Sequence, residues 1–157
     1  MKLPHSFVAM GILSIALLSG CTITQHVRPV TTGTPITKIY VQNNPAVHMR
    51  GLVPEVVTQL ELLGYQAETF DGKPPAEAIH YMTVTANWRW DMAMYLVFFR
   101  AILFEDGKAI GSAEYDAMRG GANMSKFGST AEKIRPLLEQ MLHDAQRPPR
   151  TASLGQP

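Results

Sequence analysis

The sequence predicts an α+β domain in two layers, with two helices packed on a mixed, mostly antiparallel sheet of about five strands. Three observations lead to this fold class. Two segments carry apolar residues at helical spacing, several others alternate apolar and polar residues or are rich in β-branched residues, and one Asp-Gly pair between two apolar runs indicates a hairpin. The 157 residues are enough for one such domain with additional segments at its ends.

The first half of this domain is predicted to be a strand, a helix and a second strand. Residues 36–42 (ITKIYVQ) are β-branched and aromatic, as is typical of a strand. Residues 52–63 place valines and leucines on one helical face, and Gly64 follows as the C-terminal cap. Residues 65–70 form the second strand. If it pairs in parallel with the first, the unit is a right-handed βαβ crossover.

The second half is predicted to be a three-stranded meander. Residues 82–90 alternate apolar and polar side chains, which indicates a strand with one buried face. Residues 94–104 are apolar at successive positions, as expected for a central strand covered on both faces. Asp106 and Gly107 both tolerate positive φ, so a two-residue turn leads into a returning strand over residues 108–117.

A last helix is predicted to cover the meander, after a glycine-rich and irregular segment at residues 118–128. Ser129 and Glu132 have the spacing of a capping box, and apolar residues follow at helical spacing. Pro136 conflicts with this start, so either the helix kinks there or it begins later than the capping box indicates. Residues 147–157 are polar and proline-rich, and we expect them to be disordered.

The composition argues against several classes of function. With 14 basic and 13 acidic side chains, the formal net charge is +1, so no basic face for nucleic acid is expected. A single cysteine excludes an intramolecular disulfide and a cysteine-based zinc site. The histidines do not have metal-ligand spacing, and no serine has the G-x-S-x-G setting of a nucleophile elbow. We expect no cofactor and no metal.

The N-terminus has the organisation of a secretory signal. Lys2 supplies a positive start, residues 7–18 form an apolar run that is short for a permanent membrane span, and residues 18–21 (LSGC) resemble the bacterial lipobox. The resemblance implies transfer of diacylglycerol to the thiol of Cys21, cleavage between Gly20 and Cys21, and N-acylation of the new terminus. Acyl chains then hold the protein on a membrane, since each buried methylene contributes about 0.8 kcal/mol.

We therefore expect four parts in the chain. They are a signal peptide at 1–20, a lipidated flexible tether at 21–35, a single periplasmic domain at 36–146 and a disordered tail at 147–157. In enteric bacteria an Asp directly after the acylated cysteine usually retains a lipoprotein in the inner membrane. Because Thr22 stands at that position, we expect the periplasmic face of the outer membrane.

Two short segments are candidates for a ligand or partner surface. The sequence WRWD at 88–91 places both tryptophans on one face of a strand, which favours burial in the core over an aromatic platform for a glycan or a partner protein. The loop at 119–126 invites comparison with a phosphate cradle. It lacks the G-x-x-x-x-G-K-[ST] pattern, however, so glycines that allow a tight return to the last helix are the favoured interpretation. The candidate residues are Trp88, Arg89, Trp90, Asp91, Asn123 and Lys126.

Three motifs are similar to those of an uncharacterised family of small proteobacterial lipoproteins. They are TANWRWD at 85–91, GSAEYD at 111–116 and GGANMSKF at 120–127. The resemblance covers about residues 21–142, and it implies a lipobox and a single α+β domain without implying an activity or a ligand. The order of strands and helices is also similar to that of envelope lipoprotein domains that assist assembly or secretion.

These observations favour a membrane-anchored envelope lipoprotein, whose domain is a non-enzymatic accessory or binding module for a protein complex or a cell-wall glycan. Two alternatives stay open. One is a small periplasmic hydrolase that uses Asp91, Glu114 or Asp116. The other is an oligomerising or membrane-inserting component that uses the apolar run at 94–104. Because both faces of that run are apolar, a buried central strand is favoured over a barrel strand.

Overall fold

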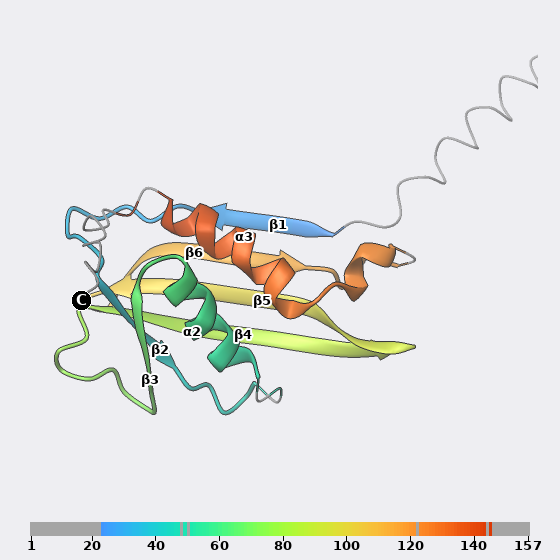
Figure 1. Cartoon of the computed structure of the whole chain (residues 1–157), viewed down its shortest axis with the longest axis horizontal. Helices are drawn as coiled ribbons and strands as arrows, with labels where there is room; N and C mark the ends of the chain where they lie inside the picture. Colours follow the sequence, from blue (N-terminus) through green and yellow to red (C-terminus); the bar gives the residue numbers. More distant parts are fainter. Residues whose placement is uncertain (1–22, 48, 50, 122, 144, 146–157) are drawn as a thin grey trace, which may run out of the picture.

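The computed structural model describes residues 23–47, 49, 51–121, 123–143 and 145. These residues form one six-stranded sheet with two α-helices and a short 3-10 helix, so the predicted α+β class is confirmed with one strand more than expected (Figure 1). The predicted signal peptide, Cys21 and the predicted tail lie outside the described residues. None of the described helices is long and apolar enough to cross a membrane.

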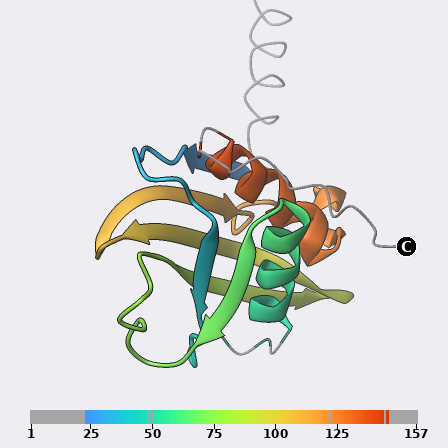
Figure 2. The same ribbon diagram turned by 60° about the vertical axis from the view of Figure 1, so that its left-hand side comes forward.

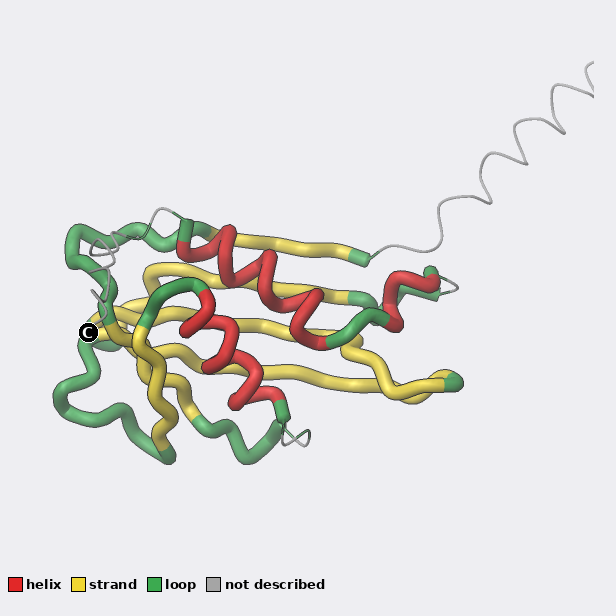
Figure 3. Tube along the Cα trace, viewed as in Figure 1, coloured by secondary structure: helices red, strands yellow, loops and turns green. Residues whose placement is uncertain are grey.

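The sheet has the strand order β1-β6-β5-β4-β2-β3. β2 pairs in parallel with β3 and β4, whereas all other neighbours are antiparallel. The predicted strand–helix–strand unit and the predicted meander are therefore both present (Figure 3). The elements are β1 (Thr24–Arg28), β2 (Lys38–Gln42), α2 (Leu52–Leu62), β3 (Gln66–Phe70), β4 (His80–Asp91), β5 (Ala93–Glu105), β6 (Lys108–Asp116), η1 (Met124–Phe127) and α3 (Thr130–Leu142).

Both α-helices cover the same face of the sheet, and the core lies between them and the strands (Figure 2). Leu60 of α2 and Leu138 of α3 are fully buried there, as are Met82 of β4 and Phe99 and Leu103 of β5. Burial of such side chains contributes about 1.5–3 kcal/mol each. The opposite face of the sheet, which we call the open face, carries no helix among the described residues.

The prediction that β5 is covered on both faces is wrong. Its side chains alternate between buried positions and positions such as Phe98, Ile102 and Phe104, which are half-buried on the open face. These outward residues gain contact from their neighbours in the sheet: the rings of Tyr81 and Phe104 stack with centroids 4.9 Å apart. A continuous apolar run can therefore occur in a strand whose second face is covered only by aromatic neighbours on the same face.

Part of the predicted tether is an edge strand. β1 pairs with β6 in a register that runs from Thr24 opposite Asp116 to Arg28 opposite Ser112. After β1, the backbone N–H of Val30 donates to the carbonyl of Met141 at 2.8 Å. The sequence does not reveal this strand, because most of its side chains are polar and exposed and its stability comes from backbone hydrogen bonds to β6.

The turn and cap predictions are confirmed. Asp106 and Gly107 have φ values of 49° and 81° in the turn between β5 and β6. The hydroxyl of Ser129 accepts from the backbone N–H of Glu132, and the Glu132 side chain accepts from the backbone N–H of Ser129. The helix α3 thus begins at the capping box, and Pro136 lies inside it rather than delaying its start.

We predict that Gly111→Ala lowers the free energy of unfolding. The variant tests how the segment after β1 packs on β6. A Cβ at this position would lie 2.7 Å from Cγ2 and 3.2 Å from Cα of Val30, in the segment that follows β1. Such overpacking costs about 1–3 kcal/mol. Urea unfolding measures the difference, and Gly33→Ala is the control, since a Cβ there meets nothing within 4 Å. Equal stability of the two variants would contradict the docking of this segment.

Candidate functional site

One ion pair between a buried lysine and an exposed aspartate joins the two segments that the sequence singles out. Nζ of Lys126 lies 2.7 Å from Oδ2 of Asp91, and it also donates to the carbonyl oxygen of Gly121 at 2.8 Å. The rings of Tyr95 and Phe127 lie 5.1 and 5.0 Å from the same ammonium group. Lys126 is buried, whereas Asp91 is exposed at the end of β4. The pair therefore holds the end of the β4–β5 hairpin against the loop that contains η1.

Asn123 has a structural role in the same loop. Its side-chain oxygen accepts from the backbone N–H of Ser125 at 3.0 Å and from the Ser125 hydroxyl at 2.8 Å, so it caps η1. The carbonyl oxygen of Lys126 accepts from Nζ of Lys133. Burial lowers the pKa of Lys133, whose ammonium lies 5.5 Å from the centre of the Tyr115 ring. These contacts position the Lys126 side chain toward Asp91.

The two tryptophans have different environments. Trp88 is half-buried and packs against the core, as the sequence predicts. The prediction of burial is wrong for Trp90, whose surface is 72% exposed. The pairing of β4 and β5 shifts register between Asn87 and Trp88, and beyond this point the hairpin extends past α2 and α3 (Figure 3). Trp90 is not among the residues that pack on the core under α2 and α3, and Arg89 beside it is also exposed.

Trp90 belongs to a group of exposed apolar side chains at this end of the sheet, which we call the apolar tip. The apolar tip comprises side chains of the β4–β5 hairpin end and of the segment from the end of β6 to η1. A shallow pocket of about 480 Å³ between these two segments is lined by Met92, Ala93, Met124 and Phe127 among others. The exposed fractions of the apolar tip are 72% for Trp90, 88% for Met92, 53% for Met94, 44% for Met118 and 73% for Met124.

Sequence reasoning missed the four methionines of the apolar tip. Methionine occurs in cores and at adaptable binding surfaces alike, so its presence alone does not indicate exposure. One signal is available in the residue pattern: the hairpin end has the sequence WDMAM, without the Gly or Asn that a tight turn favours. Met92 occupies this turn with a φ of 61°, in the left-handed region that non-glycine residues seldom adopt.

The first described residues lie at the same end of the sheet as the apolar tip. Thr24 pairs with Asp116, the last residue of β6 and two positions before Met118. Cγ1 of Ile23 lies 3.4 Å from the position that a Cβ on Gly120 would occupy. Figure 1 shows the start of β1 on the side toward which the β4–β5 hairpin points.

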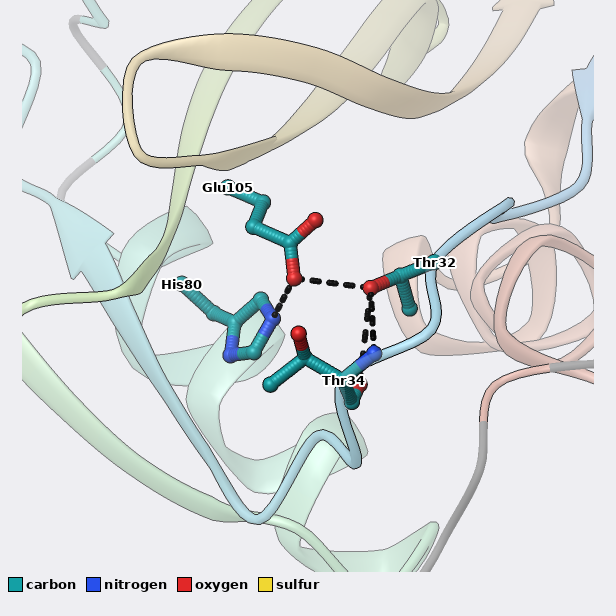
Figure 4. A network of polar contacts seen from close by, with 4 residues as sticks. All are labelled: Thr32, Thr34, His80 and Glu105. Atoms are coloured by element: carbon teal, nitrogen blue, oxygen red, sulfur yellow. Dashed lines mark hydrogen bonds and ion pairs between the residues drawn. The ribbon is translucent and has the colours of Figure 1, made fainter.

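A second polar network occupies the opposite end of the sheet (Figure 4). The hydroxyl of Thr32 donates to Oε1 of Glu105 at 2.7 Å, and Nε2 of His80 lies 3.2 Å from the same oxygen. The backbone N–H of Thr34 donates to the Thr32 hydroxyl at 3.0 Å. Both side chains bind the carboxylate, and the imidazole does not bridge hydroxyl and carboxylate as a catalytic base would. The network clamps the segment before β2 to β4 and β5.

The carboxylates of the hydrolase alternative each have a partner of their own. Asp91 binds Lys126 at the hairpin end. Oε2 of Glu114 lies 2.7 Å from Nε of Arg100, on the open face of the sheet. Oδ1 of Asp116 accepts from the backbone N–H of Met118 at 2.7 Å. In the part of the chain that the structure describes, no group of three or more His, Cys, Asp or Glu side chains could hold a metal ion.

Comparison with known proteins gives a likeness of fold. No family model matches the sequence, and a search of curated proteins finds no match. The structure is similar to that of the PelC dodecamer from Paraburkholderia phytofirmans, with a TM-score of 0.52, 11% sequence identity, and coverage of 81% of this chain and 99% of that chain. A PelC variant dodecamer from the same organism gives a TM-score of 0.47 at 15% identity, covering 73% of this chain and 98% of that chain. At 11% identity, the first likeness concerns the fold alone.

We predict that Asp91→Asn destabilises the protein by about 1 kcal/mol, because the buried ammonium group of Lys126 loses its carboxylate partner. The loss is modest because the Asp91 side chain is half-exposed and water weakens the ion pair. Amide hydrogen exchange is expected to accelerate in the hairpin end and in the η1 loop. The control is Glu68→Gln, which removes the solvent-exposed partner of Lys38 and is expected to change stability by less than about 0.5 kcal/mol. Indistinguishable exchange in the wild type and Asp91→Asn would contradict the role of the Lys126–Asp91 pair.

We predict that the network at Glu105 makes stability depend on pH. The hydrogen bond from Thr32 is the largest cause of a lowered pKa of the Glu105 carboxyl. A lowered pKa means that the network stabilises the fold above the usual glutamate value of about 4.3, and that this contribution is lost as the pH falls through the folded-state pKa. The difference in urea stability between wild type and Glu105→Gln should therefore shrink in acid. Glu139→Gln, on the exposed side of α3, controls for general charge effects. A difference that stayed constant from neutral to acid pH would contradict this prediction.

Proposed function

We propose that this protein is a bacterial envelope lipoprotein, anchored through Cys21 to the periplasmic face of the outer membrane, and that its domain is a non-enzymatic accessory or binding module. The lipobox-like residues 18–21 support the anchor, and Thr22 supports the outer membrane over the inner membrane. The partner of the module is a protein complex of the envelope or a cell-wall glycan.

The observation that carries this proposal is the short distance between the lipobox and the folded domain. Ile23 already contacts the region of Gly120, and β1 begins at Thr24. Only Thr22 separates Cys21 from Ile23. Because extended chain spans about 3.3–3.6 Å per residue, the Cα atom of Cys21 stays within about 7 Å of that of Ile23. The domain is therefore held directly at the membrane surface, with one end of its sheet toward the lipid.

The described contacts support a binding module over a hydrolase. Asp91, Glu114 and Asp116 hold structural partners, and the Thr32–Glu105–His80 network has the connectivity of a clamp. The open face offers a surface for a partner: it carries half-buried aromatic rings and a polar hollow of about 340 Å³. Residues that line the hollow include His26, Arg28, Arg100, Ser112 and Glu114.

Assembly into an oligomer is a second candidate role, and the similarity to a PelC dodecamer favours it. The sheet has two short edge strands, β1 and β3, and an open face that a neighbouring copy can cover. The mass of the detergent-extracted full chain, measured by light scattering with the detergent contribution subtracted, tests this role. A monomer at all concentrations would exclude it without affecting the anchor.

The anchor is tested at Cys21. We expect the mature protein to begin with a diacylated and N-acylated cysteine, visible by mass spectrometry of the N-terminal peptide, and to fractionate with the outer membrane on a density gradient. Cys21→Ser should abolish the lipid mass and the outer-membrane position, and globomycin should cause the lipidated precursor to accumulate. Ser19→Ala, which keeps a small residue before the cleavage site, is the matched control and should behave as wild type. An unmodified Cys21 in the wild-type protein would refute the proposal.

A further inference from the structure

We propose that the apolar tip inserts into the headgroup region of the membrane that carries the anchor. The domain then meets the membrane at two points, the lipid on Cys21 and the side chains of Trp90, Met92, Met94, Met118 and Met124. This inference rests on the proposed anchor, because the anchor supplies the membrane that the tip contacts.

The apolar tip is an exposed surface that the fold itself does not use. Its five side chains have exposed fractions between 44% and 88%, and the hairpin that carries three of them extends past both α-helices (Figure 1). Clustered apolar side chains at a surface mark an interaction site. The turn residue supports this interpretation. Met92 has a positive φ at a position where glycine or asparagine would relieve strain.

The position of the first described residues indicates that the apolar tip contacts lipid. Ile23 lies against Gly120, in the connection that runs from Met118 to Met124. The Cα atom of Cys21, two positions earlier, lies within about 7 Å of that of Ile23, so acyl chains on Cys21 enter the bilayer at the same end of the sheet as that connection. The same geometry brings the exposed methionines to the membrane surface, whereas a partner at this end would have to displace the lipid anchor.

The chemistry of the apolar tip suits the lipid–water interface. Tryptophan prefers this region because its ring is apolar while its N–H can bond to water or headgroups. Methionine side chains are flexible and adapt to irregular apolar surroundings. Two acidic side chains at this end of the sheet have partners: Asp91 binds Lys126, and Asp116 accepts from the backbone N–H of Met118. Arg89 and Arg119 are exposed there, and their charges complement anionic headgroups.

The ion pair between Lys126 and Asp91 holds together the two segments that carry the apolar tip. Lys126 holds the hairpin end, with Trp90 and Met92, against the loop that carries Met124. Both halves are thus fixed before they meet lipid, which reduces the entropy lost on insertion. The opposite end of the sheet carries the polar Thr32–Glu105–His80 network and points away from the membrane, so the open face remains accessible to a partner.

The two tryptophans of the chain make a direct test possible. In Trp88→Phe, the fluorescence of the full, lipidated protein comes from Trp90 alone. The protein is reconstituted into vesicles of phosphatidylethanolamine and phosphatidylglycerol, with or without a phosphatidylcholine brominated near the headgroup end of its acyl chains. We expect the brominated lipid to quench Trp90, and we expect iodide added to the water to quench it only weakly. Met92→Asn, which tolerates the positive φ, should weaken the lipid quenching.

The matched control places the reporter at the opposite end of the sheet. Ile79 is 51% exposed, and its carbonyl accepts from Asp106 in the β5–β6 turn. In the triple variant Trp88→Phe/Trp90→Phe/Ile79→Trp, iodide should quench the reporter and the brominated lipid should leave it unchanged. Unchanged circular dichroism and melting temperature verify the fold of every variant.

Flotation of the vesicles separates the two proposals. If the protein does not float with the lipid, the anchor proposal fails. If it floats while iodide quenches Trp90 strongly and the brominated lipid leaves it unchanged, the anchor stands and membrane insertion of the apolar tip is refuted. Shielding from iodide without quenching by the brominated lipid would also refute insertion, because another protein copy would then cover the tip.

Discussion

The backbone hydrogen bonds between β1 and β6 determine at which end of the sheet the first described residues lie. They join residues 24–28 to the edge of the sheet and bring Ile23 next to the loop after β6. Without this pairing, the segment before β2 would be a spacer of variable reach, and no end of the domain would be distinguished from another. With it, Ile23 and the start of β1 are fixed at one end of the sheet.

The two ends of the sheet have opposite chemical character, and each depends on one charged side chain. At one end, Lys126 joins the hairpin to the η1 loop and leaves apolar side chains on the outside. At the other end, the carboxylate of Glu105 binds the Thr32 hydroxyl and the His80 imidazole, and so holds the segment before β2 on the sheet. Both groups stabilise connections between segments that are distant in sequence.

This arrangement gives a physical basis for a module that presents a surface close to a membrane. The helices occupy one face of the sheet, the proposed lipid contact occupies one end, and the open face stays available. Aromatic rings and paired charges cover that face, as in surfaces that bind proteins or sugars.

The sequence by itself determined the elements whose signals are local. The helical stripe of α2, the capping box at Ser129, the Asp106–Gly107 turn and the alternation in β4 each depend on neighbouring residues, and the structure contains all of them. At Pro136 the sequence left two outcomes open, and the structure decided between them: two capping hydrogen bonds fix the start of α3 before the proline.

Only the tertiary structure decided which residues form the candidate site. β1 has polar side chains and exists because β6 offers an unpaired edge, which no local pattern reveals. Trp88 and Trp90 share one strand face in the sequence pattern, yet burial requires an opposing element, and only Trp88 packs against the core. The pairing of Asp91 with Lys126 likewise depends on how the hairpin and the η1 loop pack, because 35 residues separate the two side chains along the chain.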